Sequence, residues 1–328
     1  MTALDNETIE RAVGAVAGSA VGDALGAGYE FSNPKPDQKI AMIGGGRFDW
    51  DPGEWTDDTQ MALAILDVIA TGDISIQAIA ANFLAWYKAD PPDIGSQTRS
   101  VLSCVDDPDD LAVAAVAYFD ANPETIGNGG LMRTAPVALA ALHDRGEIAQ
   151  LAEAIASLSH AHPDSVTACV LWSLAIQQAI TTAQPDIPFD FEGAVRNGLD
   201  HVADDLQERW DRLIAEAVDG PPGKFNPNGW VVTAFQAALS AIVNTPVPDT
   251  EPSVHFHDAL VAAVRIGNDT DTVAAIAGGL LGGRWGTAAI PHDWKTPVHG
   301  NRRWGVEKTD LAELEALART AAIRAPNV

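Results

Sequence analysis

Apolar residues recur along this chain at the three- and four-residue spacing that places them on one face of a helix. The first such run extends from Ile9 to Val21, and comparable runs follow through the rest of the chain. No stretch keeps the strict alternation of apolar and polar residues that a half-buried strand requires. About a dozen helical segments joined by loops predict an all-α protein. Because no linker clearly divides the chain, we expect residues 1–328 to form a single compact multi-helix domain.

The helix expected over residues 6–24 carries Gly14, Gly18 and Gly22, spaced four residues apart. Glycine lowers helix stability, so a row of glycines predicts close backbone contact with a second helix. Two carboxylates follow, Asp23 at the end of this helix and Glu30 in the next loop. Asp23 fits a helix cap and the rim of a ligand site equally well.

Two oxygen-rich segments stand far apart in the chain and have a similar pattern. Trp55-Thr56-Asp57-Asp58-Thr59 and Asn268-Asp269-Thr270-Asp271-Thr272 each precede an apolar run, as at the start of a buried helix. A loop rich in Pro and Gly, residues 32–54, precedes the first segment. A loop of that length is typical of a lid or a binding loop.

Carboxylate and hydroxyl oxygens are the ligands that Mg²⁺, Mn²⁺ and Ca²⁺ prefer. If the two segments meet, four carboxylates converge, and two divalent cations would remove their mutual repulsion. The pattern therefore predicts a two-metal site that orients vicinal hydroxyls or a diphosphate and acidifies a bound water. The alternative is two ordinary acidic helix starts, each balancing its own helix dipole, which never meet.

Three further segments offer polar groups to such a site. Gly127-Asn128-Gly129-Gly130 is predicted to open a helix whose free N–H groups suit a phosphate, although the glycines equally suit close packing. His160-Ala161-His162 has no third nitrogen or sulfur ligand nearby, which favours a pocket wall over a zinc site. Asp93 stands on a rigid turn, and with Glu30 it is a spare carboxylate for proton transfer.

Charge and composition narrow the possible partners. The formal net charge is −25, from 45 acidic and 20 basic residues, which repels nucleic acid and anionic membranes. The acidic N-terminus lacks a signal-peptide pattern, and no apolar run is long enough to span a bilayer. Cys104 and Cys169 lie apart among apolar neighbours, which favours reduced, buried residues. We therefore expect a cytoplasmic monomer that binds neither nucleic acid nor membrane.

The informative motifs follow one another in a fixed order. They are Gly22-Asp23-Ala24-Leu25-Gly26, Trp55-Thr56-Asp57-Asp58-Thr59, Pro92-Asp93-Ile94-Gly95, Gly127-Asn128-Gly129-Gly130-Leu131-Met132-Arg133, His160-Ala161-His162-Pro163 and Asn268-Asp269-Thr270-Asp271-Thr272. This set resembles the ADP-ribosylglycohydrolase family over residues 10–305. The resemblance implies an all-helical enzyme with two Mg²⁺ (or Mn²⁺) ions. It also implies hydrolytic removal of ADP-ribose from a modified protein side chain, with an arginine-type N-glycosidic link favoured, or from a related small conjugate.

The resemblance also implies roles for individual residues. The metal ligands would be Thr56, Asp57, Asp58, Asp269, Asp271 and Thr272. The substrate-binding residues would be Gly127, Asn128, Gly129, Gly130 and His160. The catalytic carboxylates would be Asp93 and Glu30, and the sequence leaves open which of them handles the proton. Ser96-Gln97 and Asn268 depart from the family's usual residues without removing a ligand.

Three alternatives to this enzyme remain at the level of sequence. One is a non-catalytic ADP-ribose-binding or immunity-type protein that counters an ADP-ribosyltransferase. The others are a pseudoenzyme and a two-metal hydrolase of another phosphate-containing small molecule. The intact acidic segments favour an active enzyme.

Overall fold

Helices make up nearly all of the regular structure. The computed structural model describes residues 4–184, 187–303 and 305–324. Within them the α-helices are α1 (Asn6–Ala27), α2 (Asp57–Ile69), α3 (Ile76–Lys88), α4 (Ser96–Leu102), α5 (Leu111–Ala121), α6 (Arg145–Ser157), α7 (Pro163–Thr182), α8 (Phe191–Arg196), α9 (Asp204–Asp219), α10 (Val231–Val243), α11 (Val254–Val264), α12 (Thr270–Trp285), α13 (His292–Lys295) and α14 (Leu311–Arg324). The all-α prediction is confirmed.

One small sheet was not predicted. Strands β1 (His299–Arg303) and β2 (Glu307–Asp310) pair antiparallel as a hairpin beside α2 and α14. Strands of four and five residues carry too little alternation of apolar and polar positions to be recognised in a sequence.

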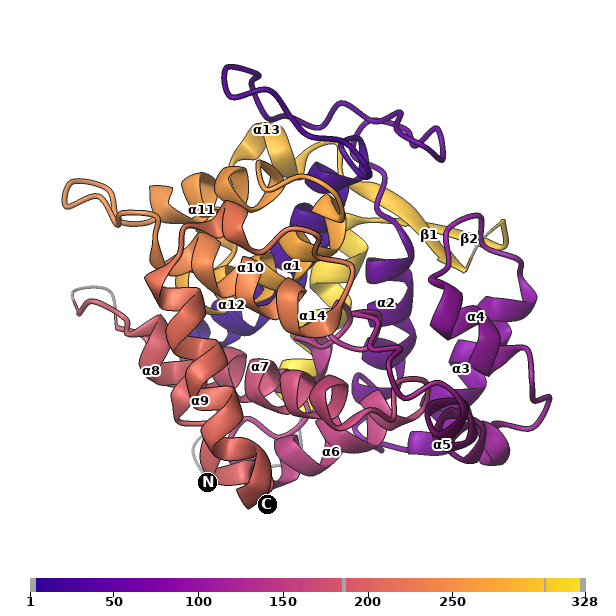
Figure 1. Ribbon diagram of the computed structural model, residues 1–328. Coiled ribbons are helices and arrows are strands. Elements are labelled where there is room, and N and C mark those ends of the chain that lie inside the picture. The colour runs from indigo at the N-terminus through magenta and orange to yellow at the C-terminus, as the bar shows by residue number, and fades with distance from the viewer. Residues whose placement is uncertain (1–3, 185–186, 304, 325–328) are drawn as a thin grey trace.

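Helices α1 and α12 form the centre of the fold and lie in close contact along their length (Figure 1). A Cβ atom on Gly18 would lie 2.4 Å from the carbonyl oxygen of Gly278, so the two backbones touch where both helices carry glycine. The contact predicted from the row of glycines is thus present. It continues to the end of α1, where a Cβ atom on Gly26 would lie 2.4 Å from the backbone of Asp271. The second oxygen-rich segment is therefore fixed beside the C-terminal end of α1.

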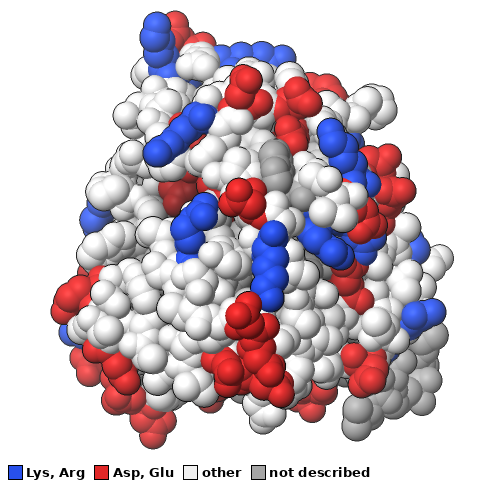
Figure 2. All heavy atoms as spheres, turned by 90° about the vertical axis from the view of Figure 1, so that its right-hand side faces the viewer, with Lys and Arg blue, Asp and Glu red and all other residues white. Residues whose placement is uncertain are grey.

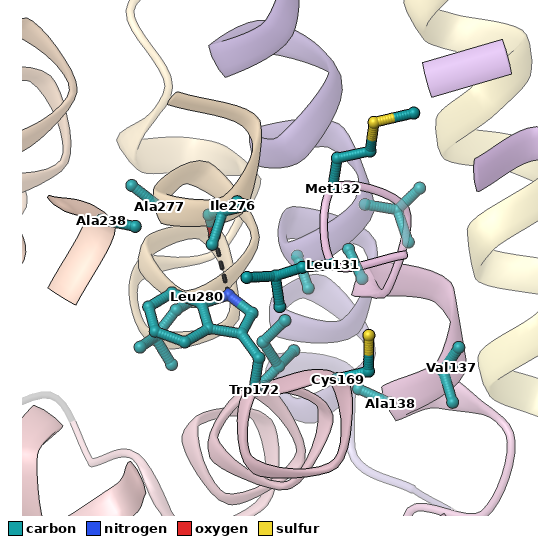
Figure 3. Packing of buried hydrophobic residues seen from close by; sticks show 14 of the residues in the cluster. Leu131, Met132, Val137, Ala138, Cys169, Trp172, Ala238, Ile276, Ala277 and Leu280 are labelled. Atoms are coloured by element: carbon teal, nitrogen blue, oxygen red, sulfur yellow. Dashed lines mark hydrogen bonds between the residues drawn. The ribbon is translucent and has the colours of Figure 1, made fainter. Parts of the chain in front are cut away.

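Other helices cover this central pair and bury it. Helices α7, α10 and α11 pack on α12, and α2, α7 and α14 pack on α1. Trp172 of α7 is fully buried, and its indole N–H donates to the carbonyl oxygen of Ile276 in α12 at 2.9 Å. Figure 3 shows this indole directed at α12, with Leu280 and Leu131 beside it. The polar bond fixes how α7 lies on α12 inside an otherwise apolar cluster.

Two local expectations are corrected. The glycine-rich segment does not open an α-helix: residues 128–134 form turns that lead into a short 3₁₀-helix, η2 (Ala135–Leu139). Pro136 has no N–H to donate, and together with the glycines it disfavours an α-helix there. Helix α1 continues three residues past Ala24, so Asp23 lies within the helix and not at its end.

The surface agrees with the acidic composition. Figure 2 shows acidic side chains spread across one face of the molecule, with Lys and Arg side chains among them. Both cysteines are free, as predicted, but only Cys169 is buried, because Cys104 lies in the exposed turn that follows α4. Among the described residues, no helix is both long enough and apolar enough to cross a membrane.

Candidate active site

A cavity of about 630 Å³ lies at the N-terminal ends of α2 and α12. The acidic residues that line it are Glu30, Asp57, Asp93, Glu124, Asp269 and Asp271. They come from both ends of the chain, because the contact between α1 and α12 brings the second oxygen-rich segment to the first. The alternative in which the two acidic helix starts never meet is therefore excluded.

Asp23 organises the first oxygen-rich segment from behind. Its carboxylate accepts the backbone N–H groups of Thr56 and Thr59, each at 3.0 Å, and the hydroxyl of Thr59 at 2.6 Å. Asp23 is fully buried, so it is neither a cap of its own helix nor part of the cavity rim. It caps α2, whose own N-cap residue, Thr56, makes no capping bond with its side chain.

Asp58 lies deeper than Asp57 and joins the two segments. The hydroxyls of Thr56 and Thr272 donate to Asp58 Oδ2 at 3.3 and 3.4 Å. Asp58 Oδ1 is buried and has no hydrogen-bond partner among the described residues. Thr56 and Asp58 do not line the cavity itself, whereas Asp57 and Thr272 do.

The second oxygen-rich segment faces Glu30. Carboxylate oxygens of Glu30, Asp269 and Asp271 all lie within 4.8 Å of one another. The side-chain amide of Asn128 donates to Asp269 Oδ2 at 2.7 Å, so Asn128 orients an acidic residue of the site. Glu30 Oε2 is buried without a partner among the described residues. Oxygen atoms thus point at one another across a small space.

This arrangement strongly opposes ionisation of the carboxyl groups. Burial, followed by the charges of neighbouring carboxylates, raises the pKa of Asp57, Asp58 and Asp271 well above the usual range. The same causes raise the pKa of Glu30 to about 9 and that of Asp93 to about 7. A buried cluster of this kind keeps its negative charges only when cations neutralise them.

The donor set fits hard divalent cations. It consists of carboxylate and hydroxyl oxygens, and two of its buried oxygens, on Asp58 and Glu30, have no hydrogen to accept from the described residues. Zinc is a poor fit, because the described residues that line this cavity include no cysteine and a single histidine, His160, among many carboxylates.

The glycine-rich segment covers His160 on the other side of the cavity. A Cβ atom on Gly129 would lie 3.0 Å from His160 Cε1, and one on Gly130 would lie 3.3 Å from His160 Cβ. These glycines therefore permit close packing, which is one of the two roles considered for them. Gly127 is held by Gln97, whose Oε1 accepts its N–H at 2.9 Å. Gly127 and Gly129 line the cavity, and Gly130 lies behind it.

The two histidines of His160-Ala161-His162 have different surroundings. His160 lines the cavity, whereas His162 is the N-cap of α7 and accepts the backbone N–H of Asp164 at 3.0 Å. The ring of His162 packs edge-on against Phe119. The structure therefore separates the pair, in line with a pocket wall and against a shared metal.

Several cavity residues were not singled out in the sequence. Arg47 and Phe48 come from the loop of residues 32–54 that was expected to be a lid or binding loop, and Phe31 directly precedes that loop. Trp230 is the N-cap residue of α10. The Arg47 guanidinium lies over the Phe31 and Phe48 rings, 5.2 and 5.8 Å from their centroids. Trp230 is 58% exposed although it is large and apolar. These residues are recognised only because their side chains lie at the surface of the cavity, and the sequence does not show which side chains do so.

A helical fold thus surrounds a cavity lined by carboxylates from both ends of the chain, which defines a protein with an acid-lined site suited to metal ions. The chain belongs to the ADP-ribosylglycohydrolase family, which matches residues 4–326. The family and the enzyme class predicted from the sequence motifs are thereby confirmed.

Individual relatives agree with this assignment. The chain is 30% identical to the ADP-ribosylarginine hydrolase Tri1 of Pseudomonas putida (strain GB-1), over 100% of this chain and 82% of that protein. It is 31% identical to the ADP-ribosyl-[dinitrogen reductase] glycohydrolase of Rhodospirillum rubrum, over 96% of this chain and 97% of that protein. The fold matches a solved structure of an ADP-ribosylglycohydrolase-related protein complex with a TM-score of 0.75 and 26% identity, over 98% of this chain and 100% of that chain.

Proposed function

We propose that this protein hydrolyses the glycosidic bond that joins ADP-ribose to a modified protein side chain, with arginine as the favoured linkage. A small ADP-ribose conjugate is the second substrate class. The observation that carries the proposal is the convergence of Glu30, Asp93, Asp57, Asp269 and Asp271 on one cavity. The linkage is supported by the relative that acts as an ADP-ribosylarginine hydrolase.

Two divalent ions, Mg²⁺ or Mn²⁺, complete the proposed site. The residues that would hold them are Thr56, Asp57, Asp58, Asp269, Asp271 and Thr272. Such ions orient the vicinal hydroxyls of a ribose and lower the pKa of a water molecule. The partnerless oxygens of Asp58 and Glu30 support this assignment, as does the mutual repulsion of the carboxylates.

Asp93 is proposed to handle the proton of the leaving group. Its pKa is raised to about 7. A carboxyl group with a pKa near neutral pH can both donate and accept a proton at that pH. Glu30 is proposed to act beside the ions, because its carboxylate shares a small space with Asp269 and Asp271. A carboxyl group that transfers protons at the scissile bond is the usual requirement of glycoside hydrolysis.

The rest of the cavity is proposed to hold the ADP part of the substrate. Gly127, Gly129 and His160 would face the diphosphate, with Asn128 holding this segment to Asp269. Trp230 offers an exposed aromatic surface on which a base would stack.

We also propose that the chain acts as a monomer and as one domain of residues 1–328 in the cytoplasm. Both ends of the chain contribute to one cavity, which supports the single domain. The free cysteines suit a reducing compartment, and the net charge of −25 disfavours nucleic acid as a partner.

A substrate panel tests the proposed function. Arginine-, serine- and acetyl-linked ADP-ribose are incubated with wild type and Asp269→Asn, in Mg²⁺, in Mn²⁺ and with a chelator. We expect cleavage of the arginine-linked substrate in a divalent metal, and a loss of about 100-fold or more with chelator or in Asp269→Asn. Asp190→Asn, which alters the N-cap of the distant α8, is the matched control. Binding of ADP-ribose without cleavage of any substrate would favour the immunity-type alternative instead.

A further inference from the structure

His160 is almost completely buried, at 1% exposure, yet it forms part of the cavity wall. Its Nε2 atom is the ring nitrogen nearest the glycine-rich segment: Cβ atoms on Gly127 and Gly129 would lie 3.5 and 3.2 Å from it. Both glycines line the cavity. No described residue forms a hydrogen bond with Nε2. A ligand in the cavity therefore meets either an N–H group or a lone pair there, depending on the tautomer of the ring.

Two hydrogen bonds favour one tautomer. Arg133 Nη2 donates to Ser159 Oγ at 2.7 Å, and Ser159 Oγ lies 2.8 Å from His160 Nδ1. A guanidinium has only donors, so the Ser159 oxygen accepts from Arg133. Among the described residues, His160 Nδ1 is the only other group bonded to Ser159 Oγ, so the buried hydroxyl hydrogen is satisfied only when it is directed to Nδ1. Nδ1 is then an acceptor, and in a neutral ring the hydrogen resides on Nε2.

The ring is neutral at physiological pH. Burial, together with the nearby charge of Arg133, lowers the pKa of His160 to about 3. The pKa of Arg133 is lowered by burial to about 10, so the guanidinium remains charged at neutral pH. Both groups thus keep the protonation states that the hydrogen-bond pattern requires.

Arg133 is costly to bury, which indicates that its position matters. It is 0% exposed and forms no ion pair with a carboxylate among the described residues. Its guanidinium lies over the Phe83 ring, 4.4 Å from the centroid, and also donates to the carbonyl oxygen of Ile155. These contacts hold the guanidinium in one place, with Nη2 directed at Ser159.

We propose that Arg133 and Ser159 are positioning residues that hold His160 as a neutral Nε2–H donor to an anionic oxygen of the ADP-ribose diphosphate. The inference rests on the proposed function for its ligand. The opposite tautomer would present a lone pair to a phosphate oxygen, which repels it. With Nε2–H, the ring instead supplies a hydrogen bond inside a cavity with many acidic side chains.

The tautomer is measured first, on the full-length protein without ligand. Long-range ¹⁵N–¹H NMR spectra distinguish a protonated Nε2 from a protonated Nδ1. We expect Nε2–H in wild type, unchanged down to about pH 4, and a mixture of tautomers in Ser159→Ala. Ser165→Ala is the matched control, because Ser165 is also a buried serine near the start of α7 and its hydroxyl has no described partner.

Ligand affinity is measured second, by calorimetry with ADP-ribose and with adenosine, which lacks the diphosphate. We expect Ser159→Ala to raise the Kd for ADP-ribose about tenfold and to leave that for adenosine unchanged. Ser159→Thr, which keeps the hydroxyl, restores the affinity, and Ser165→Ala matches wild type.

Two results would overturn the proposal: Nδ1–H in the wild-type ring, or equal ADP-ribose affinities in Ser159→Ala and Ser165→Ala. If wild type binds no ADP-ribose, the proposed hydrogen bond from His160 to the diphosphate is wrong, and so is the proposed function. The tautomer measurement still tests whether Ser159 positions the ring, because it requires neither binding nor hydrolysis.

Discussion

The carboxylate of Asp23 accepts a 2.6 Å hydrogen bond from the hydroxyl of Thr59 and so joins α1 to α2 behind the acidic cavity. The same carboxylate accepts the backbone N–H groups of Thr56 and Thr59. The first N–H groups of a helix need acceptors, and here a residue of another helix supplies them. Asp57 and Asp58 are thereby relieved of capping, and their carboxylates remain available to the site.

Replacing Asp23 tests this division of roles. Asp23→Ala leaves three buried donors without an acceptor, so we expect a loss of about 2 kcal/mol in the free energy of unfolding. We also expect Mn²⁺ to bind at least about tenfold more weakly, because the groups around metal ligands orient them. Denaturant unfolding and metal titration measure the two effects. Asp144→Ala removes the cap of α6 and should lower stability without changing Mn²⁺ affinity; equal affinities in both variants would contradict the role of Asp23.

Stability without metal should fall as the pH rises. Burial raises the pKa of Asp23 to about 6 and that of Asp93 to about 7, both above the value of 3.8 in an unfolded chain. The folded state therefore binds protons more tightly than the unfolded state, and this contribution is complete below about pH 4 and lost as the pH rises through 6 and 7.

Metal should reverse this trend, because cations favour the ionised carboxylates. We expect the free energy of unfolding in chelator to decrease from about pH 5 to about pH 8, and Mn²⁺ to stabilise the protein more at the higher pH. Urea unfolding at both values, with and without Mn²⁺, checks this. Stability in chelator that increases over the same range would show that the carboxyl groups are not proton-binding in the folded protein.

The contact between α1 and α12 should tolerate no side chain. A Cβ atom on Gly278 would lie 2.1 Å from the carbonyl oxygen of Gly18, and both atoms belong to rigid backbones. We expect Gly278→Ala to lower the free energy of unfolding by about 3 kcal/mol and to reduce activity, since the helices must move apart. Gly223→Ala is the control, because nothing lies within 4 Å of its added Cβ atom. Similar thermal stabilities of the two variants would argue against backbone contact.

Replacing Asp93 and replacing Glu30 should affect different properties of the enzyme. We expect Asp93→Asn to lower kcat about 100-fold or more while ADP-ribose affinity is retained, as for loss of a general acid. Glu30→Gln should instead weaken Mn²⁺ binding, because its carboxylate lies with those of Asp269 and Asp271. Steady-state kinetics and calorimetry separate these effects, with the exposed Asp106→Asn as control. A larger loss of kcat in Glu30→Gln at saturating metal would assign the proton transfer to Glu30.

Much of the fold could be predicted from local patterns. The helical spacing of apolar residues identified the helices, and the glycines of α1 indicated a close helix contact. The prediction failed where local signals were weak or ambiguous. Residues 128–134 look like the start of a helix, but Pro136 and the packing of the glycines over His160 determine a chain of turns.

The site was harder to predict, because residue types do not reveal partners. Asn128, which was expected to contact substrate, lines the cavity and also donates to Asp269, a contact that no local pattern indicated. Arg133 entered only as part of a motif, although it lies buried beside Ser159 and His160. Arg47 and Trp230 could not be singled out, since exposure at a cavity depends on the packing of distant segments.

The sequence by itself determined the chemistry that this protein can offer: two oxygen-rich segments, two spare carboxylates, a glycine-rich turn and a histidine. It also determined the helical fold, because apolar spacing is a local property of the chain. Only the tertiary structure decided that Asp23 caps α2, that Asp58 lies behind Asp57, and that Arg133 reaches His160 through Ser159. These relationships depend on distances between residues remote in the chain, which the close packing of α1 against α12 fixes and which no local pattern encodes.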